Sequence, residues 1–228
     1  MKKIKWMLLN VSLSITDMVS KLKSSSYSDE KGKGFIFNKV RSGELVGKFV
    51  EKLTFEEVIP SLYGETTTFE RVEYRIVEFY INENTLPVIA IINPPRTLKP
   101  FAINLVKVLG LGVSLEEINI EPMVWVESIS KLTPLELTQI ELSQIKINEY
   151  ALAKMQVSSS KDLRYYYEKS FSDKNTSRVD KVHLFMISPN YPGKVKISRT
   201  GLVVIDTKHE KDMTDLLFRS LLETYVKT

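Results

Sequence analysis

Two short segments of the sequence are apolar throughout, and each is followed by a segment with helical periodicity. Residues 86–92 (LPVIAII) and 202–205 (LVVI) predict strands that are covered on both faces, because half-exposed strands alternate with polar residues. In residues 101–109 and 212–226, apolar residues recur at helical spacing. Since an apolar helical stripe needs a surface to cover, we expect both strands to be central and both helices to pack across a sheet.

Alternating or apolar patterns elsewhere predict further strands, which makes the expected fold class α+β with mainly antiparallel sheets and a helix packed on each. The predicted strands cover residues 3–13, 35–53 with a turn at Ser42-Gly43, 69–81, 123–129, 150–157, 163–171, 179–187 and 194–198. Thr54 is expected to cap a short helical turn at residues 55–57. Thr133, Pro134 and Glu136 would make a capping box before residues 135–149 (LELTQIELSQIKINE). The spacing further along that segment is extended, so helix and strand both stay open.

The chain shows the same layout twice, in residues 1–118 and 119–228, which either form two domains or one continuous domain. Each half has a hairpin, a short apolar strand, Asn or Asp, a polar loop and an amphipathic helix. This layout indicates two degenerate sheet-plus-helix repeats from an internal duplication. The alternative is that any α+β chain yields two such stretches.

The residue types present exclude several kinds of site. The sequence contains no Cys and only two His, so thiolate zinc sites, Cys nucleophiles and His-rich metal sites are excluded. A metal would have to bind carboxylates, and we predict no metal and no cofactor. No segment has the length and apolarity of a membrane-spanning helix or a signal peptide. We therefore expect a cytoplasmic protein without a membrane partner.

Positive charge is concentrated in the first quarter of the chain. The net charge is +4, while residues 1–52 alone contain 11 basic and 5 acidic residues. Such a region is compatible with nucleic acid or an acidic partner, although a solvated Lys-rich surface gives the same pattern.

One motif resembles part of a metal-dependent nuclease site. Asp206-Thr207-Lys208 follows an apolar strand, as the acid-x-Lys motif of these nucleases does, but Asn190 stands where their first acid is expected. Asp206 and Lys208 are therefore weak catalytic candidates. We expect His183 to be packed in a strand and His209 to be solvated. No other catalytic motif is present, which favours a protein that is not an enzyme.

Tyrosine and arginine occur together in two predicted strands, and a sheet that exposes both can stack bases and neutralise phosphates. The candidate nucleic-acid-binding residues are Arg71, Arg75, Arg96, Lys99, Arg164, Tyr165 and Tyr167. The first hypothesis is thus a non-catalytic protein that binds DNA or RNA. The alternatives are a protein-interaction subunit of a bacterial or phage multiprotein system, with a protein partner or a second copy of the chain, and the degenerate nuclease.

Overall fold

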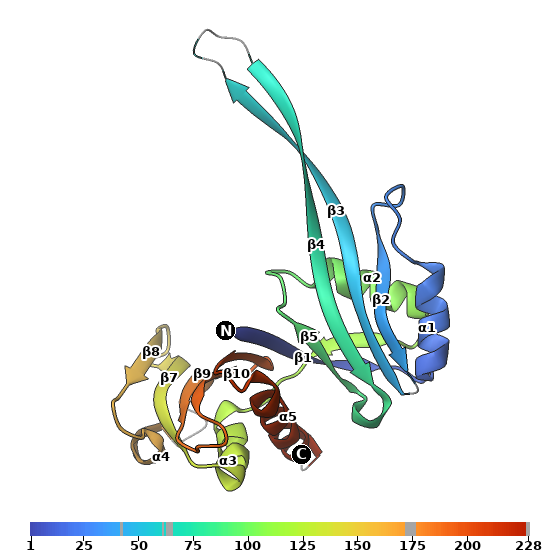
Figure 1. The fold of residues 1–228 in the computed structure, drawn as a ribbon. Coiled ribbons are helices and arrows are strands. Elements are labelled where there is room, and N and C mark those ends of the chain that lie inside the picture. The colour runs from blue at the N-terminus through green and yellow to red at the C-terminus, as the bar shows by residue number, and fades with distance from the viewer. Residues whose placement is uncertain (42, 61, 63–65, 172–176, 227–228) are drawn as a thin grey trace. The chain divides into compact units, whose positions relative to one another are not determined.

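The computed structural model describes residues 1–41, 43–60, 62, 66–171 and 177–226. This part of the chain is mixed α/β, with five α-helices and strands that pair antiparallel in every described register (Figure 1). The predicted mixture of helices with antiparallel sheet is confirmed. The chain divides into two compact units, Trp6–Glu116, here the N-terminal unit, and Met1–Lys5 with Glu117–Thr228, here the C-terminal unit.

The N-terminal unit contains a long hairpin flanked by shorter strands in the order β2-β3-β4-β5-β1, with β6 also paired to β1. The β3–β4 register is unbroken from Glu44↔Asn82 to Pro60↔Thr66. The elements are β1 (Lys2–Asn10), which begins in the other unit, α1 (Ile15–Ser24), β2 (Lys33–Arg41), β3 (Glu44–Pro60), β4 (Thr66–Asn82), the 3-10 helix η1 (Glu83–Thr85), β5 (Val88–Ile92), α2 (Lys99–Leu109) and β6 (Ser114–Glu117).

Four phenylalanines lie in the core of the N-terminal unit. Phe35, Phe49, Phe79 and Phe101 are each at most 1% exposed, and the ring centroids of neighbouring pairs lie 5.3 to 6.2 Å apart, a favourable range for aromatic contacts. Apolar side chains of α1 and α2 belong to the same cluster. Gly47 lies opposite Phe79, where a Cβ atom would be 2.8 Å from the ring, so glycine leaves room for the ring.

The C-terminal unit continues from the first residues of β1 in the strand order β1-β11-β10-β9-β7-β8. Its helices α3 and α5 contact each other, α3 contacts β9, and α5 contacts β11. Between the two helices, the Trp125 indole donates a buried hydrogen bond of 2.8 Å to Ser220 Oγ. The elements are α3 (Pro122–Leu132), β7 (Leu135–Lys146), β8 (Leu152–Ser158), α4 (Arg164–Phe171), β9 (Arg178–Met186), β10 (Gly193–Ser198), β11 (Leu202–Asp206) and α5 (Glu210–Val226).

The two apolar segments form the strands β5 and β11, and the predicted helices follow them as α2 and α5. In β5, Val88, Ile89 and Ile91 are buried. In β11, Val203 is buried but Val204 is only half-buried. The prediction that β11 is covered fully on both faces is therefore wrong.

Two predicted strands are helices instead. Residues 123–129 belong to α3, which starts at Pro122 and buries Trp125 and Ile129 one helical turn apart. Residues 163–171 are mostly in α4. Asp162 Oδ1 accepts a 3.1 Å hydrogen bond from the backbone N–H of Arg164 and so stabilises the start of that helix.

Two other predictions are resolved by strand pairing. Residues 55–57 are not a helical turn, because each of them pairs with β4. The ambiguous segment 135–149 is mostly strand β7. Its pairing shifts between Leu142 and Ile145, where Gln144 has a φ of 55°, and this bulge interrupts the alternation along the strand.

Ser42 of the predicted Ser42-Gly43 turn lies outside the described residues. Among the residues that the structure describes, no helix has the length and apolarity needed to cross a bilayer.

Candidate functional site

The hairpin of β3 and β4 extends beyond the core of the N-terminal unit (Figure 1). Val77, Phe79 and Ile81 of β4 are buried, whereas residues 54–60 and 66–74 are exposed at every position. We call these two exposed segments the arm. Their seven cross-strand pairs span roughly 20 Å at the usual rise of a strand. Both faces of the arm are therefore open to other molecules.

Both outer edges of the arm are also open. Beside β3, pairing with β2 reaches Glu51, and the Lys52 N–H donates a 2.7 Å hydrogen bond to the Gly32 carbonyl. Beside β4, β5 pairs only with residues 78–80. No other strand of the described chain pairs with the arm. Edges with unpaired backbone groups can recruit strands of other chains, and charged side chains limit unspecific pairing.

The composition of the arm explains how it stays extended without a core. It is rich in threonine, valine and aromatic residues, which favour strands. Its charged residues are four glutamates and one arginine, which gives a net charge of −3. Residues directly opposite in the two strands share a face. The odd-numbered residues continue the face that is buried at Phe49 and Val77, here the core-side face, and the even-numbered residues form the outer face.

On the core-side face, the charges of the arm are paired within the chain. Arg71 Nη1 lies 2.6 Å from Glu57 Oε1, and the same guanidinium also bridges to Glu73. Its central carbon lies 5.9 Å from the centre of the Phe55 ring, within cation–π range. The carboxylates of Glu73 and then Glu57 raise the pKa of Arg71, which stays charged. The acidic residues of this face already have a cation beside them.

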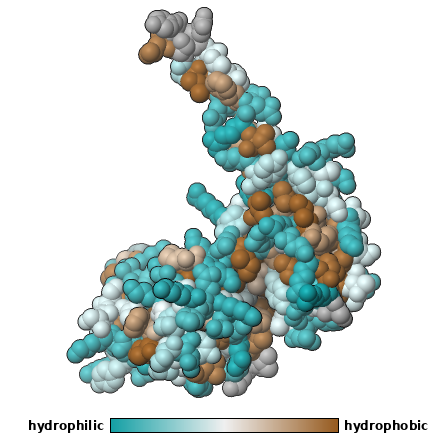
Figure 2. Space-filling model, in the orientation of Figure 1, coloured by the Kyte–Doolittle hydropathy of each residue, from teal (hydrophilic) through white to brown (hydrophobic). Residues whose placement is uncertain are grey.

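On the outer face, two glutamates lie directly opposite each other. Glu56 pairs in register with Glu70, and no described Lys, Arg or His forms an ion pair with either carboxylate. Like charges at directly opposite positions destabilise a strand pair. The apolar side chains of Val58 and Val72 flank the glutamates and are 59% and 40% exposed. Figure 2 shows apolar side chains at intervals along the projecting hairpin, between polar ones.

The predicted nucleic-acid-binding residues of the N-terminal unit lie in different settings. Arg71 and Arg75 are both on the core-side face of β4, and Arg75 forms a 2.8 Å ion pair with Glu51. Arg96 is exposed in the loop before α2, and Lys99 is exposed in the first turn of that helix. Neither Arg96 nor Lys99 forms an ion pair with a described residue. Of these four residues, the strand arginines Arg71 and Arg75 are thus already neutralised by carboxylates, whereas no described carboxylate pairs with the loop and helix cations.

The remaining predicted binding residues are on helix α4 of the C-terminal unit, so they do not alternate between the faces of a strand. Arg164 Nε donates a 2.7 Å hydrogen bond to Asp162. Tyr165 is 74% exposed, whereas Tyr167 is half-buried, and burial followed by the Glu121 charge raises its pKa. Of the two tyrosines, only Tyr165 has a freely exposed ring.

The acid-x-Lys motif lies at the end of β11. Asp206 is exposed and pairs in register with Lys194 of β10. A nearby depression of about 510 Å³ is lined by Asn190 and His209 together with residues of α5, and its lining does not include Asp206 or Lys208. Across the described residues, no group of three or more His, Cys, Asp or Glu side chains is placed to hold a metal ion. The geometry adds no support to the nuclease hypothesis.

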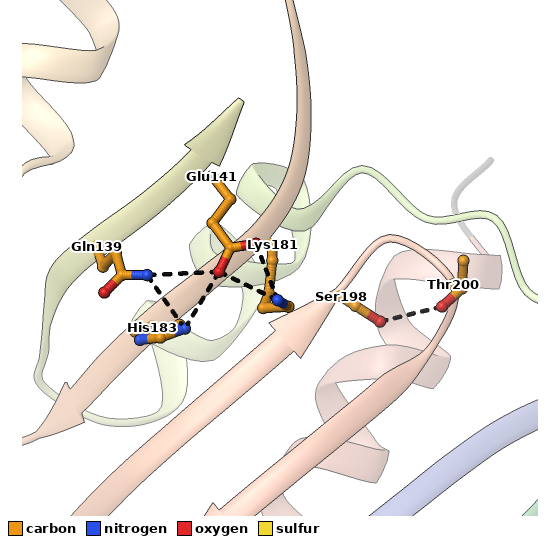
Figure 3. A network of polar contacts seen from close by, with 6 residues as sticks. All are labelled: Gln139, Glu141, Lys181, His183, Ser198 and Thr200. Carbon is orange, nitrogen blue, oxygen red and sulfur yellow. Dashed lines mark hydrogen bonds and ion pairs between the residues drawn. The ribbon is translucent and has the colours of Figure 1, made fainter. Parts of the chain in front are cut away.

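His183 belongs to a polar network on β7 and β9 (Figure 3). The Glu141 carboxylate accepts hydrogen bonds of 2.8 and 3.1 Å from Lys181 Nζ, and its Oε1 atom lies 3.8 Å from His183 Nε2. Gln139 Nε2 lies 3.5 Å from the same imidazole nitrogen. Burial lowers the pKa of His183, Lys196 and Lys181 lower it further, and Glu141 opposes them. We interpret the network as cross-strand pairs that stabilise the sheet.

The lowered pKa of His183 predicts a loss of stability in acid. An unfolded histidine has a pKa of about 6.5, which is above the lowered pKa of His183 in the folded chain. Protonation therefore favours the unfolded chain. The stabilising effect is complete above that pH and is lost as the pH falls through about 6.5 toward the lower folded pKa. The melting temperature should therefore drop more between pH 7.5 and pH 5.5 in the natural chain than in His183→Gln. Equal drops by circular dichroism would contradict this assignment.

No model of a known protein family matches the sequence, and a search of curated proteins finds no significant match. Sequence reasoning missed the arm, although one signal was present. Along β4 the apolar residues move from the even positions Val72, Tyr74 and Ile76 to the odd positions Val77, Phe79 and Ile81.

Proposed function

We propose that this protein is an interaction subunit that docks onto a protein partner through the arm. The observation that carries the proposal is the exposure of apolar side chains along a strand pair whose two edges are open. Phe55, Ile59 and Phe69 on the core-side face are 43% to 53% exposed, and Val58 and Val72 are exposed on the other. Exposed apolar side chains that gather on one projecting element, between polar residues, favour a binding site over a purely structural role. An open strand edge adds backbone hydrogen bonds to what a partner can gain.

The charge of the arm favours a protein partner over nucleic acid. Four glutamates and one arginine would repel a phosphate backbone, and Arg71 and Arg75 are already paired with carboxylates. Nucleic-acid affinity depends on cations that can replace counterions at the phosphates. Binding of DNA or RNA elsewhere on the chain stays a prediction, as does internal duplication of the sheet-plus-helix layout.

Shortening the hairpin should remove the partner but leave the fold intact. In the proposed variant, Asn-Gly replaces residues 54–72 and joins Leu53 to Glu73, which already face each other across the hairpin. Because every removed residue that the structure describes is exposed, no core contact is lost. We expect a melting temperature within about 2 °C of the natural chain, since shifts of that size correspond to under about 1 kcal/mol.

The binding half of this experiment is affinity capture from the cells that produce the protein, after nuclease treatment. Proteins retained by the full chain should be lost from the shortened chain at equal bait levels. If the shortened chain melts normally and retains the same proteins, the arm is not the docking element. If it melts much lower, the arm contributes to the core, and its exposed apolar side chains serve the fold rather than a partner.

A further inference from the structure

We infer that the outer face of the arm binds a protein segment that presents a lysine or arginine between apolar side chains, carried by a protein other than this chain. The inference rests on the proposed docking function and specifies the chemistry of the partner. The two faces of the strand pair differ in how their glutamates are neutralised.

The two faces hold equal numbers of glutamates but differ in cations. Glu57 and Glu73 on the core-side face share Arg71 between them. Glu56 and Glu70 on the outer face are directly opposite, and none of the described cations pairs with them. The nearest outer-face cation in sequence is Lys52, four residues before Glu56 on the same strand, and the Thr54–Val72 pair lies between them on that face. The outer face therefore carries two negative charges that no cation of the described residues neutralises.

The surroundings of the glutamates determine what kind of cation fits. Val58 lies two residues beyond Glu56 on the same face, and Val72 lies two residues from Glu70. Tyr74, 52% exposed, continues the apolar surface toward the base of the hairpin. A partner that covers these side chains would remove water from the carboxylates as well. Burying two carboxylates without a cation is costly, so the covering segment must supply positive charge between apolar groups.

The same charges disfavour two other occupants. A second copy that docked face to face by a twofold axis would place four carboxylates together, because a twofold interface uses the same patch on both subunits. Like charges brought together across an interface are strongly unfavourable. A nucleic acid would place phosphates against the same glutamates. A basic, partly apolar segment of another protein is complementary to the face in both charge and polarity.

A display library of random peptides tests the inference even while the partner is unidentified. The library is first depleted on the arm-shortened chain and then selected on the full chain, so the retained peptides report on the arm. We expect these peptides to carry Lys or Arg flanked by apolar residues. One retained peptide, labelled with a fluorophore, is then the probe for anisotropy titrations against the full chain and two double variants.

The two double variants make the same change of net charge on opposite faces. Glu56→Gln with Glu70→Gln should weaken peptide binding at least tenfold, and Glu57→Gln with Glu73→Gln should change it less than threefold. Affinity for the natural chain should also fall as salt rises. All four positions are exposed, so both variants should melt like the natural chain, and relief of the outer-face repulsion should not lower the melting temperature.

Each contrary result points to a different error. Equal weakening by both variants would mean that general charge, and not the outer face, drives binding. Retained peptides without basic residues, or peptides insensitive to Glu56→Gln with Glu70→Gln, would overturn the inference and leave docking through the arm intact. Failure to retain any peptide after depletion on the shortened chain would count against the arm as a docking element and so against the proposed function as well.

Discussion

Replacing Val203 with Asp should unfold the C-terminal unit, whereas the same replacement at Val204 should leave it folded. Val203 is fully buried in β11, and its register neighbours Ile4 and Ile197 are also fully buried. A carboxylate there would have no cation and no water. Burying it costs several kcal/mol, which is a large part of a total stability of roughly 5–15 kcal/mol.

Val204 is a matched control because it is the same residue type on the opposite face of the same strand. Its register neighbours are Lys3 and Lys196, and it is only half-buried. An Asp at this position would lie between two ammonium groups, so we expect a loss of about 1 kcal/mol or less. Circular-dichroism melts decide the pair. Equal melting temperatures for Val203→Asp and Val204→Asp would show that the burial pattern of β11 is wrong.

Phe79→Ala should destabilise the N-terminal unit by about 3–5 kcal/mol, the usual cost of removing a buried phenylalanine. Phe79 is 1% exposed, its ring centroid lies 5.4 Å from that of Phe101 and 6.2 Å from that of Phe35, and both contacts would be lost. The cavity cannot be filled from the opposite strand, because Gly47 lies there. Urea titration followed by circular dichroism measures the loss.

Phe69→Ala is the control for this prediction, since Phe69 is on the same strand and the same face. It is 52% exposed in the arm, so its removal should change stability by no more than about 0.5 kcal/mol. A loss of several kcal/mol at Phe69 would mean that the arm is packed against the rest of the chain. A small loss at Phe79 would mean that the aromatic cluster is not the core.

The parts of the fold that the sequence predicts are those in which local pattern and burial agree. Strands β5 and β11 and the helices after them are recognisable because their apolar residues face a core. Segments α3 and α4 are mistaken for strands because their β-branched and aromatic residues favour strands. In the fold, packing stabilises α3 as a helix and capping by Asp162 stabilises the start of α4. In α3, burial of Trp125 and Ile129 overrides the strand propensity of valine and isoleucine.

The arm escapes prediction for a different reason. An alternating strand predicts one buried face, and Val72, Tyr74 and Ile76 are natural candidates for it. In the folded chain these residues are exposed, and the buried face is formed by Val77, Phe79 and Ile81. The change of parity at residues 76 and 77 coincides with the point where the hairpin leaves the core. The proposed docking function accounts for these apolar residues on the face opposite the core, where the fold of the described chain does not bury them.

The most direct measurement of docking through the arm is a photo-cross-link from its outer face in the cells that produce the protein. With p-benzoylphenylalanine in place of Val72, irradiation should give an adduct with another protein that survives nuclease and is destroyed by protease. The same probe in place of Ile103, which is 55% exposed on α2 of the same unit, should not give that adduct. A Val72 adduct that nuclease destroys, or no adduct above the level at Ile103, would contradict the proposed role of the arm.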